Sequence, residues 1–226
     1  MKKTIILLTA LAGLFLAGFK PSYSPITQGT IIYEVTDIKA DHLNPLTKMM
    51  VSDSKITVRF QGNHILTEMK MPLMKNTTIL DGKTHQGLTL IEKFMDKIAV
   101  PMDEEDLAKQ RAERGEVSSV SVKTEKKIIQ GFICRRAVIQ TDQGAEVEMF
   151  FTEDIQPPAK NSRFQFSGID GFPLEMDMYR DGRKLRLVAV SVETNSVKPQ
   201  LFSLEIPKGF EVKTFAYLQE LRESWR

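Results

Sequence analysis

The chain is poor in the residue types that most often hold a small exported protein together or carry its chemistry. Its 226 residues include one cysteine, three histidines and one tryptophan. The single thiol, Cys134, excludes an internal disulfide, and His42, His64 and His85 lie too far apart in the sequence for close zinc-ligand spacing. The sequence also lacks a nucleophile elbow, a phosphate-binding loop and an H-E-x-x-H motif. We therefore expect no enzyme activity, no cofactor and no resident metal.

Neither sign of charge dominates. The chain carries 31 Lys and Arg against 29 Asp and Glu. Three of the lysines, Lys2, Lys3 and Lys20, lie in the first 24 residues, so the remainder is close to neutral. Its charges of both signs are interspersed, which provides no basic patch for nucleic acid or for an anionic lipid surface. We therefore expect no nucleic-acid partner.

Residues 1–24 have the pattern of a secretory signal peptide. Two lysines near the start precede an uncharged apolar run that ends at Gly18, and a polar, proline-containing stretch follows. The run is shorter than the ~20 residues that a spanning helix needs, and no cysteine follows it for a lipid anchor. We predict cleavage between Gly18 and Ser24. Residues 25–226 would then form a single domain in the periplasm or outside the cell, without a transmembrane anchor.

A first β-hairpin is predicted from residues 54–60 and 64–71. The first segment alternates apolar and polar side chains, and Gly62-Asn63 is a two-residue turn. Counting back from the turn pairs Phe60 with Ile65, Val58 with Thr67 and Ile56 with Met69. One face of both strands then becomes apolar, as a correct register should make it.

A second hairpin is predicted from residues 174–180 and 183–190 around the turn Asp181-Gly182. The register pairs Leu174 with Ala189, Met176 with Leu187 and Met178 with Leu185 on one face. The other face sets Asp177 against Arg186, an opposite-charge pair that stabilises a sheet by a few tenths to ~1 kcal/mol.

The remaining pattern predicts a mainly β (α+β) fold. We expect strands over 29–36, 77–80, 117–127, 132–140, 146–152 and 201–206, another strand after Asp81-Gly82, helices over 101–114 and 213–225, and a helical turn within 41–50. A sheet of about nine or ten antiparallel strands has roughly 900 Å² on one face, whereas a short helix shields about 200 Å². Two or three short helices cannot cover that face, so the sheet must curl into a half-barrel.

Four segments resemble an exported family of Gram-negative bacteria whose domain has no known function. They are GTIIYEV (29–35), KKIIQGFICRRA (126–137), FTEDI (151–155) and GIDGFPLE (168–175). The last segment is also similar to the GLPGLI family, and both families resemble periplasmic lipoprotein carriers of the Lol type in architecture. The resemblance covers most of the chain after the leader. It implies a curved antiparallel half-barrel with an apolar concave face, and it carries over no catalytic residue.

The roles of the methionines and of the single cysteine have more than one interpretation. Flexible methionine side chains such as those of Met69, Met71 and Met74 fill irregular cores, line lipid sites or bind Cu(I). Cys134 is interpreted as a small buried apolar residue of a strand, the alternative being a reactive or intermolecular thiol.

The favoured function is a non-enzymatic envelope binding protein that shields a lipid or an acylated protein in the concave face. The alternatives are an envelope structural or interaction protein with a fully packed core and an envelope partner, and a methionine-based Cu(I)-handling protein. The residues predicted to line the ligand site are Ile56, Val58, Phe60, Ile65, Met69, Met71, Leu174, Met176, Met178, Leu185 and Leu187.

Overall fold

The computed structural model describes residues 24–39, 53–113, 115–142, 144–156, 164–180 and 183–223. The strands are β1 (Gln28–Lys39), β2 (Lys55–Gln61), β3 (His64–Met71), β4 (Met74–Asp81), β5 (Gln86–Lys93), β6 (Asp96–Met102), β7 (Val117–Ile129), β8 (Phe132–Thr141), β9 (Glu146–Thr152), β10 (Phe172–Arg180), β11 (Arg183–Glu193) and β12 (Glu211–Val212). The helices are α2 (Glu104–Ala112) and α3 (Phe215–Glu223), and η1 (Pro199–Phe202) is a 3-10 helix. The predicted apolar leader, the helical turn within 41–50 and the Asp181-Gly182 turn lie outside these residues.

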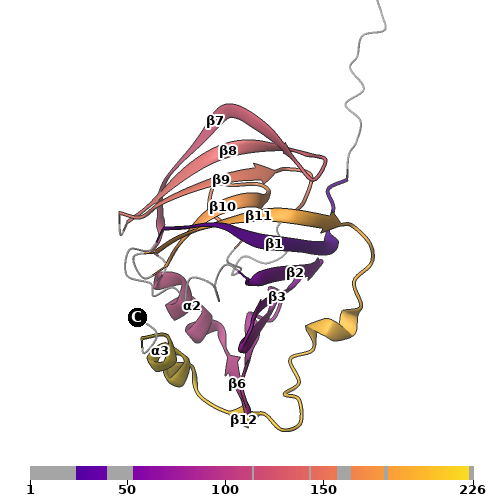
Figure 1. The fold of residues 1–226 in the computed structure, drawn as a ribbon, viewed down its shortest axis with the longest axis vertical. Helices are drawn as coiled ribbons and strands as arrows, with labels where there is room; N and C mark the ends of the chain where they lie inside the picture. The colour runs from indigo at the N-terminus through magenta and orange to yellow at the C-terminus, as the bar shows by residue number, and fades with distance from the viewer. Residues whose placement is uncertain are drawn as a thin grey trace, which may run out of the picture.

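All twelve strands belong to one open sheet, in the order β12-β6-β5-β4-β3-β2-β1-β11-β10-β9-β8-β7. Neighbours pair antiparallel except β12, which runs parallel to β6. The sheet is two meanders, β1 to β6 and β7 to β11, joined where β1 pairs with β11. They meet at an angle, and α2 and α3 lie on the inner side of the bend (Figure 1). The predicted mainly-β curved sheet is therefore confirmed, with one parallel pair that was not expected.

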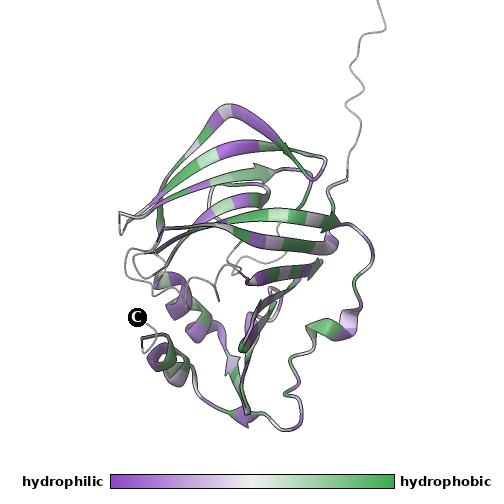
Figure 2. Ribbon diagram, viewed as in Figure 1, coloured by the Kyte–Doolittle hydropathy of each residue, from purple (hydrophilic) through white to green (hydrophobic). Residues whose placement is uncertain are grey.

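The first hairpin has the predicted register. Phe60 lies opposite Ile65, Val58 opposite Thr67 and Ile56 opposite Met69. Burial alternates along β2, with Ile56, Val58 and Phe60 inside. Figure 2 shows the same alternation of hydrophobic and hydrophilic residues along many of the strands. Side-chain period and turn length together set this register, because a slip of one residue would expose the whole apolar face.

The second hairpin is confirmed where the structure describes it. Met176 pairs with Leu187, Asp177 with Arg186 and Met178 with Leu185. Every residue from Phe172 to Asp177 is buried, although only alternate side chains face the interior. Strand β10 is therefore covered on both faces, because long basic side chains of β7 and β11 pair with Glu175 and Asp177 on its outer face.

Helix α2 begins later than predicted. Pro101 and Met102 extend β6 rather than starting a helix, because Pro101 lies in register opposite Leu88 of β5. Asp103 is the N-cap and forms a capping box with Asp106, so two of the helix's free N–H groups gain acceptors. The acidic run 103–106 occupies the cap and first turn, where negative charge compensates the helix dipole. No helix among the described residues is long and apolar enough to cross a membrane.

The predicted strand over 201–206 is wrong. Residues 199–202 form η1, and the chain then continues without regular structure to Pro207. Instead of pairing, this segment packs Val197, Phe202 and Leu204 onto Leu66 and Ile79. It lies on the opposite side of β3 and β4 from the helices (Figure 1). Strand β6, which was not predicted, completes the lower half of the sheet.

Candidate functional site

The structure gathers most of the predicted lining residues into one apolar cluster. Members from both hairpins are at most 3% exposed: Ile56, Val58, Phe60, Ile65, Leu174, Met176 and Leu187. Met69 is partly buried against the same cluster. Met71 and Leu185 are half-buried and do not belong to the cluster, and the side chain of Met178 lies outside the described residues. Most of these residues therefore lie in the interior, and their role as the lining of a ligand site stays a prediction. The interior face is covered by the protein's own side chains.

An aromatic stack fills the centre of the interior. Phe164, from the connection between β9 and β10, lies 5.5 Å from the ring of Tyr33 and 5.4 Å from the ring of Phe172. Phe172 in turn stacks on Phe60 at 5.6 Å. Four rings thus join β1, β2, β10 and a segment that belongs to no strand. We call residues 164–171 the plug segment, because its ring occupies the space between the two halves of the sheet.

A hydrogen bond holds Tyr33 at one end of this stack. Tyr33 is fully buried, and its hydroxyl donates a hydrogen bond of 2.6 Å to the carbonyl of Pro173. Burial, with a smaller contribution from Cys134, raises the pKa of Tyr33 well above its ordinary value. The hydroxyl therefore stays protonated and serves as a structural donor between β1 and β10.

Sequence patterns did not mark Phe164 or Tyr33 as interior residues. Both lie where periodicity gives no long-range information: Tyr33 in a strand with no predicted partner, Phe164 in a polar connection. The glycine at 171 was the available signal. A side chain there would collide with the carbonyl oxygen of Thr152 and lie 2.7 Å from Phe151 Cδ2. Such a close approach indicates that the plug segment is pressed against β9.

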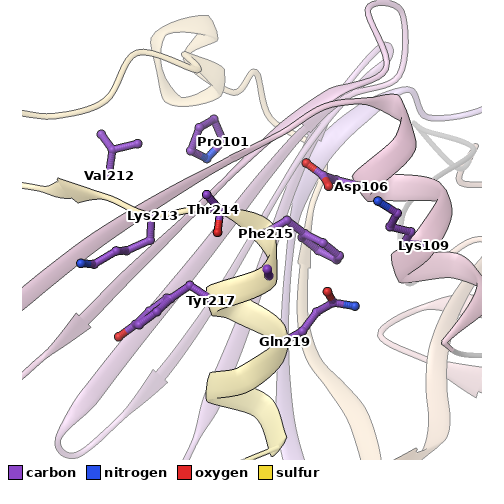
Figure 3. Close-up of a pocket in the computed structure, with 10 residues that line it drawn as sticks. Pro101, Asp106, Lys109, Val212, Lys213, Thr214, Phe215, Tyr217 and Gln219 are labelled. Atoms are coloured by element: carbon purple, nitrogen blue, oxygen red, sulfur yellow. The ribbon is translucent and has the colours of Figure 1, made fainter.

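A hollow lies between α2, α3 and β6, with a volume of about 790 Å³ (Figure 3). Its walls are Pro101, Asp106, Lys109, Val212, Lys213, Thr214, Phe215, Ala216, Tyr217 and Gln219. Much of its polar surface is already engaged: Lys213 pairs with Glu211, and Gln219 Nε2 donates to Glu113 Oε1 at 2.6 Å. Polar and charged side chains thus share the walls of this groove with apolar ones such as Phe215 and Val212.

The outer face of β10 and β11 carries a dense ionic cluster. The side chain of Asp177 is 1% exposed and accepts bonds from Arg186 Nε at 2.9 Å and Lys184 Nζ at 2.6 Å. Glu175 pairs with Lys127, whose ammonium also lies 5.4 Å from the ring centroid of Phe150. Burial tends to raise the pKa of Asp177, but hydrogen bonds from Arg186 and Lys184 outweigh it and lower that pKa. These carboxylates are neutralised by fixed partners, which suits a structural role.

The methionines at the first hairpin are adjacent. Met71 lies opposite Met74 across the β3–β4 turn, and Met69 is two residues along β3. Within the described ranges, no group of three or more His, Cys, Asp or Glu is placed to hold a metal. The Cu(I) alternative rests on thioethers alone and stays a prediction.

Comparisons with known proteins assign no family. No family model matches the chain, and no curated protein matches it. Among solved structures, PNGF-II crystallised in space group C2 is 16% identical with a TM-score of 0.48, over 88% of this chain and 33% of that one. LprF from Mycobacterium bovis is 12% identical with a TM-score of 0.34, over 77% of this chain and 89% of that one. The chain thus spans about a third of the PNGF-II structure. Its relation to the GLPGLI and Lol-type families stays a prediction.

Proposed function

We propose that the protein is a non-enzymatic binding protein of the bacterial envelope. It is exported to the periplasm or beyond, and it shields a lipid or acyl chain on the concave side of its half-barrel. The observation that carries the proposal is the position of Phe164. At the centre of the interior, the ring of Phe164 comes from a connecting segment and not from a strand or helix with its own hydrogen-bonded ladder. Such a filling can be exchanged for a guest while the sheet stays intact.

The energetics favour an acyl chain of ordinary length as the guest. Removing a buried phenylalanine from a core costs about 3–5 kcal/mol. Each buried methylene of a ligand returns about 0.8 kcal/mol, so about four to six methylenes offset the loss of the Phe164 contacts. A chain of 12–16 carbons exceeds this requirement, whereas a short carboxylic acid does not. The protein would therefore select long apolar ligands by length.

The plug segment also contains a polar defect. Gln165, next to Phe164, has a buried Oε1 that no described residue bonds. An unsatisfied buried acceptor costs about 1–3 kcal/mol, which lowers the free energy needed to displace the segment. A ligand headgroup or water that donates to this oxygen would favour the ligand-bound state further.

The test is binding of a fluorescent 16- or 18-carbon fatty acid to wild type, Phe164→Ala and Phe202→Ala. Phe202 is buried in the separate outer cluster, so it is the matched control. We expect wild type to bind, Phe164→Ala to bind at least tenfold more tightly, and Phe202→Ala to bind as wild type does. Native mass spectrometry of the gently purified protein should detect a lipid. Absence of both lipid and probe binding in all three proteins would refute the proposal.

A second function is favoured by the burial of the lining residues. Side chains at most 3% exposed are those of a packed core, as expected of an envelope interaction protein without an internal ligand. The same titration separates the two, because a packed protein would bind no probe even when Phe164→Ala opens a cavity. For the Cu(I) alternative, calorimetric titration with Cu(I) should compare wild type with a triple variant at Met69, Met71 and Met74. If the protein handles Cu(I) through these methionines, the triple variant would lose the Cu(I) binding that wild type shows.

A further inference from the structure

Two neighbouring β-turns present apolar side chains to solvent. The β3–β4 turn at Pro72-Leu73 and the β5–β6 turn at Phe94-Met95 lie at the same end of the sheet, because Met74 pairs with Lys93 between them. Leu73 is 50% exposed, Phe94 is 74% exposed and Met95 is 94% exposed. We call these three residues the apolar tip. In Figure 1 it belongs to the lower end of the molecule, where β6 begins beside β12.

At the β5–β6 turn, the hairpin explains the backbone conformation but not the choice of a phenylalanine: a two-residue turn between Lys93 and Asp96 requires a positive φ at its first position. Phe94 has φ of +54°, in the left-handed region that favours glycine or asparagine and penalises a bulky side chain. Glycine or asparagine would meet the need for positive φ at lower cost, and the ring is mostly exposed, so neither turn geometry nor core packing accounts for an aromatic side chain here. Phe94 is therefore a candidate for a role in binding.

We infer that the apolar tip inserts into the interfacial region of a lipid bilayer and docks the protein on a membrane surface. Leucine, phenylalanine and methionine are side chains that partition into the boundary between headgroups and acyl chains, ~5–10 Å deep. Hairpin ends can enter that layer without exposing unpaired ladder groups, since their strands are hydrogen-bonded below the turn.

The surroundings of the apolar tip fit this occupant. Lys70, Lys93 and Lys97 are exposed at the bases of the two hairpins, and their long stems can reach headgroup phosphates while their methylenes stay near the apolar layer. Acidic residues partly balance these lysines. Glu68 and Glu92 share the partner Lys75, so the two carboxylates leave excess negative charge on the same strands. Apolar insertion rather than net charge must therefore drive docking, which predicts binding to zwitterionic lipid.

A protein partner fits the apolar tip less well. Stable protein interfaces cover about 800 Å² on each partner, whereas the exposed parts of three side chains offer only roughly 300–400 Å². They also lie at the ends of two hairpins rather than on a flat patch. A second copy of the chain would meet the same shortage of area, so self-association at this surface is an outcome that the test must detect.

The test is sedimentation of the exported, purified protein with phosphatidylcholine vesicles at low and at 0.5 M salt. The variants are Phe94→Ser/Met95→Ser and, because asparagine tolerates positive φ, Phe94→Asn/Met95→Ser. The matched control is Ile128→Ser/Ile133→Ser, which removes an exposed apolar pair (72% and 60%) at the opposite end of the sheet. All proteins share one N-terminus, so any contribution of the leader cancels.

We expect wild type and the control to bind within twofold of each other at both salt concentrations, and both tip variants to bind at least tenfold more weakly. A tryptophan placed at position 94 should be quenched by spin labels on the acyl chains. Absent wild-type binding, an equal loss in the control, or loss of binding in 0.5 M salt would each overturn the inference. So would a wild-type dimer that the tip variants abolish. The inference does not depend on an internal ligand, so it stands or fails separately from the fatty-acid titration.

Discussion

Arg186 lies directly opposite Asp177 on neighbouring strands, and its Nε donates a hydrogen bond of 2.9 Å to the buried carboxylate. The guanidinium Nη2 adds a second bond of 3.3 Å to the other oxygen. A bidentate contact of this kind is stronger and more specific than a single ion pair. The pair also fixes the register of β10 and β11 on the face away from the core.

Asp177→Asn should remove a pH-dependent contribution to the stability of the protein. Because its partners lower the pKa of Asp177, the folded state favours the ionised form. That stabilisation is complete above the ordinary aspartate pKa of about 4 and disappears as pH falls through the lower folded-state value. We expect the variant to lose about 1–3 kcal/mol at pH 7 and the difference from wild type to shrink below about pH 4.

Urea unfolding between pH 2.5 and 7 measures this difference. Glu153→Gln is the control, because Glu153 is exposed in its pair with Arg135 and should contribute less than about 1 kcal/mol. An Asp177→Asn difference that stays constant over the whole pH range would contradict the assignment.

Cys134 should be unreactive in the folded protein. Its side chain is fully buried, and burial raises its pKa to about 12. The thiolate that reacts with disulfide reagents is then nearly absent at pH 8. We expect Ellman's reagent to modify Cys134 only at the rate of unfolding, and immediately in 6 M guanidinium chloride. Rapid labelling of the native protein would instead favour the reactive-thiol alternative.

Gly171→Ala should be severely destabilising, although Gly171 lies in no regular element. The added methyl group would collide with the backbone of Thr152, which cannot move without disturbing β9. We expect a loss of about 2–4 kcal/mol, in the range of overpacked sites. Gly62→Ala is the comparison: it has open space but φ of +55°, so only about 1 kcal/mol of backbone strain is expected. Thermal unfolding followed by circular dichroism should rank the two variants in this order.

Met176→Ala and Met95→Ala should differ sharply although the chemical change is the same. Met176 is 2% exposed within the interior cluster, whereas Met95 is 94% exposed at the apolar tip. Core truncation costs about 2–5 kcal/mol, and loss of an exposed side chain costs almost nothing. Denaturant midpoints of both variants check this expectation. A Met176→Ala loss below about 1 kcal/mol would indicate a loosely filled interior.

Local patterns predicted the hairpins well because the register of a hairpin depends on residues that are close together in the sequence. Phe60 and Ile65 are separated by a four-residue span, and alternation with a two-residue turn leaves one register that buries both. The same reasoning placed Met176 beside Leu187 on the interior face. The strand expected near Leu201 failed because Phe202 buries its ring on the outside of the sheet, a contact that hydrophobic content alone does not distinguish from strand pairing.

The sequence by itself determined the two hairpins with clear turn signals, β2–β3 and β10–β11, and which side of their strands is apolar, since side-chain period and turn residues act over a few positions. Only the tertiary structure decided how the apolar side is covered. The Tyr33 hydroxyl reaches the carbonyl of Pro173 across 140 residues, and Phe164 enters between strands that share no local pattern with it. Such contacts depend on how the two halves of the sheet bend toward each other, and that bend results from the packing of the whole chain.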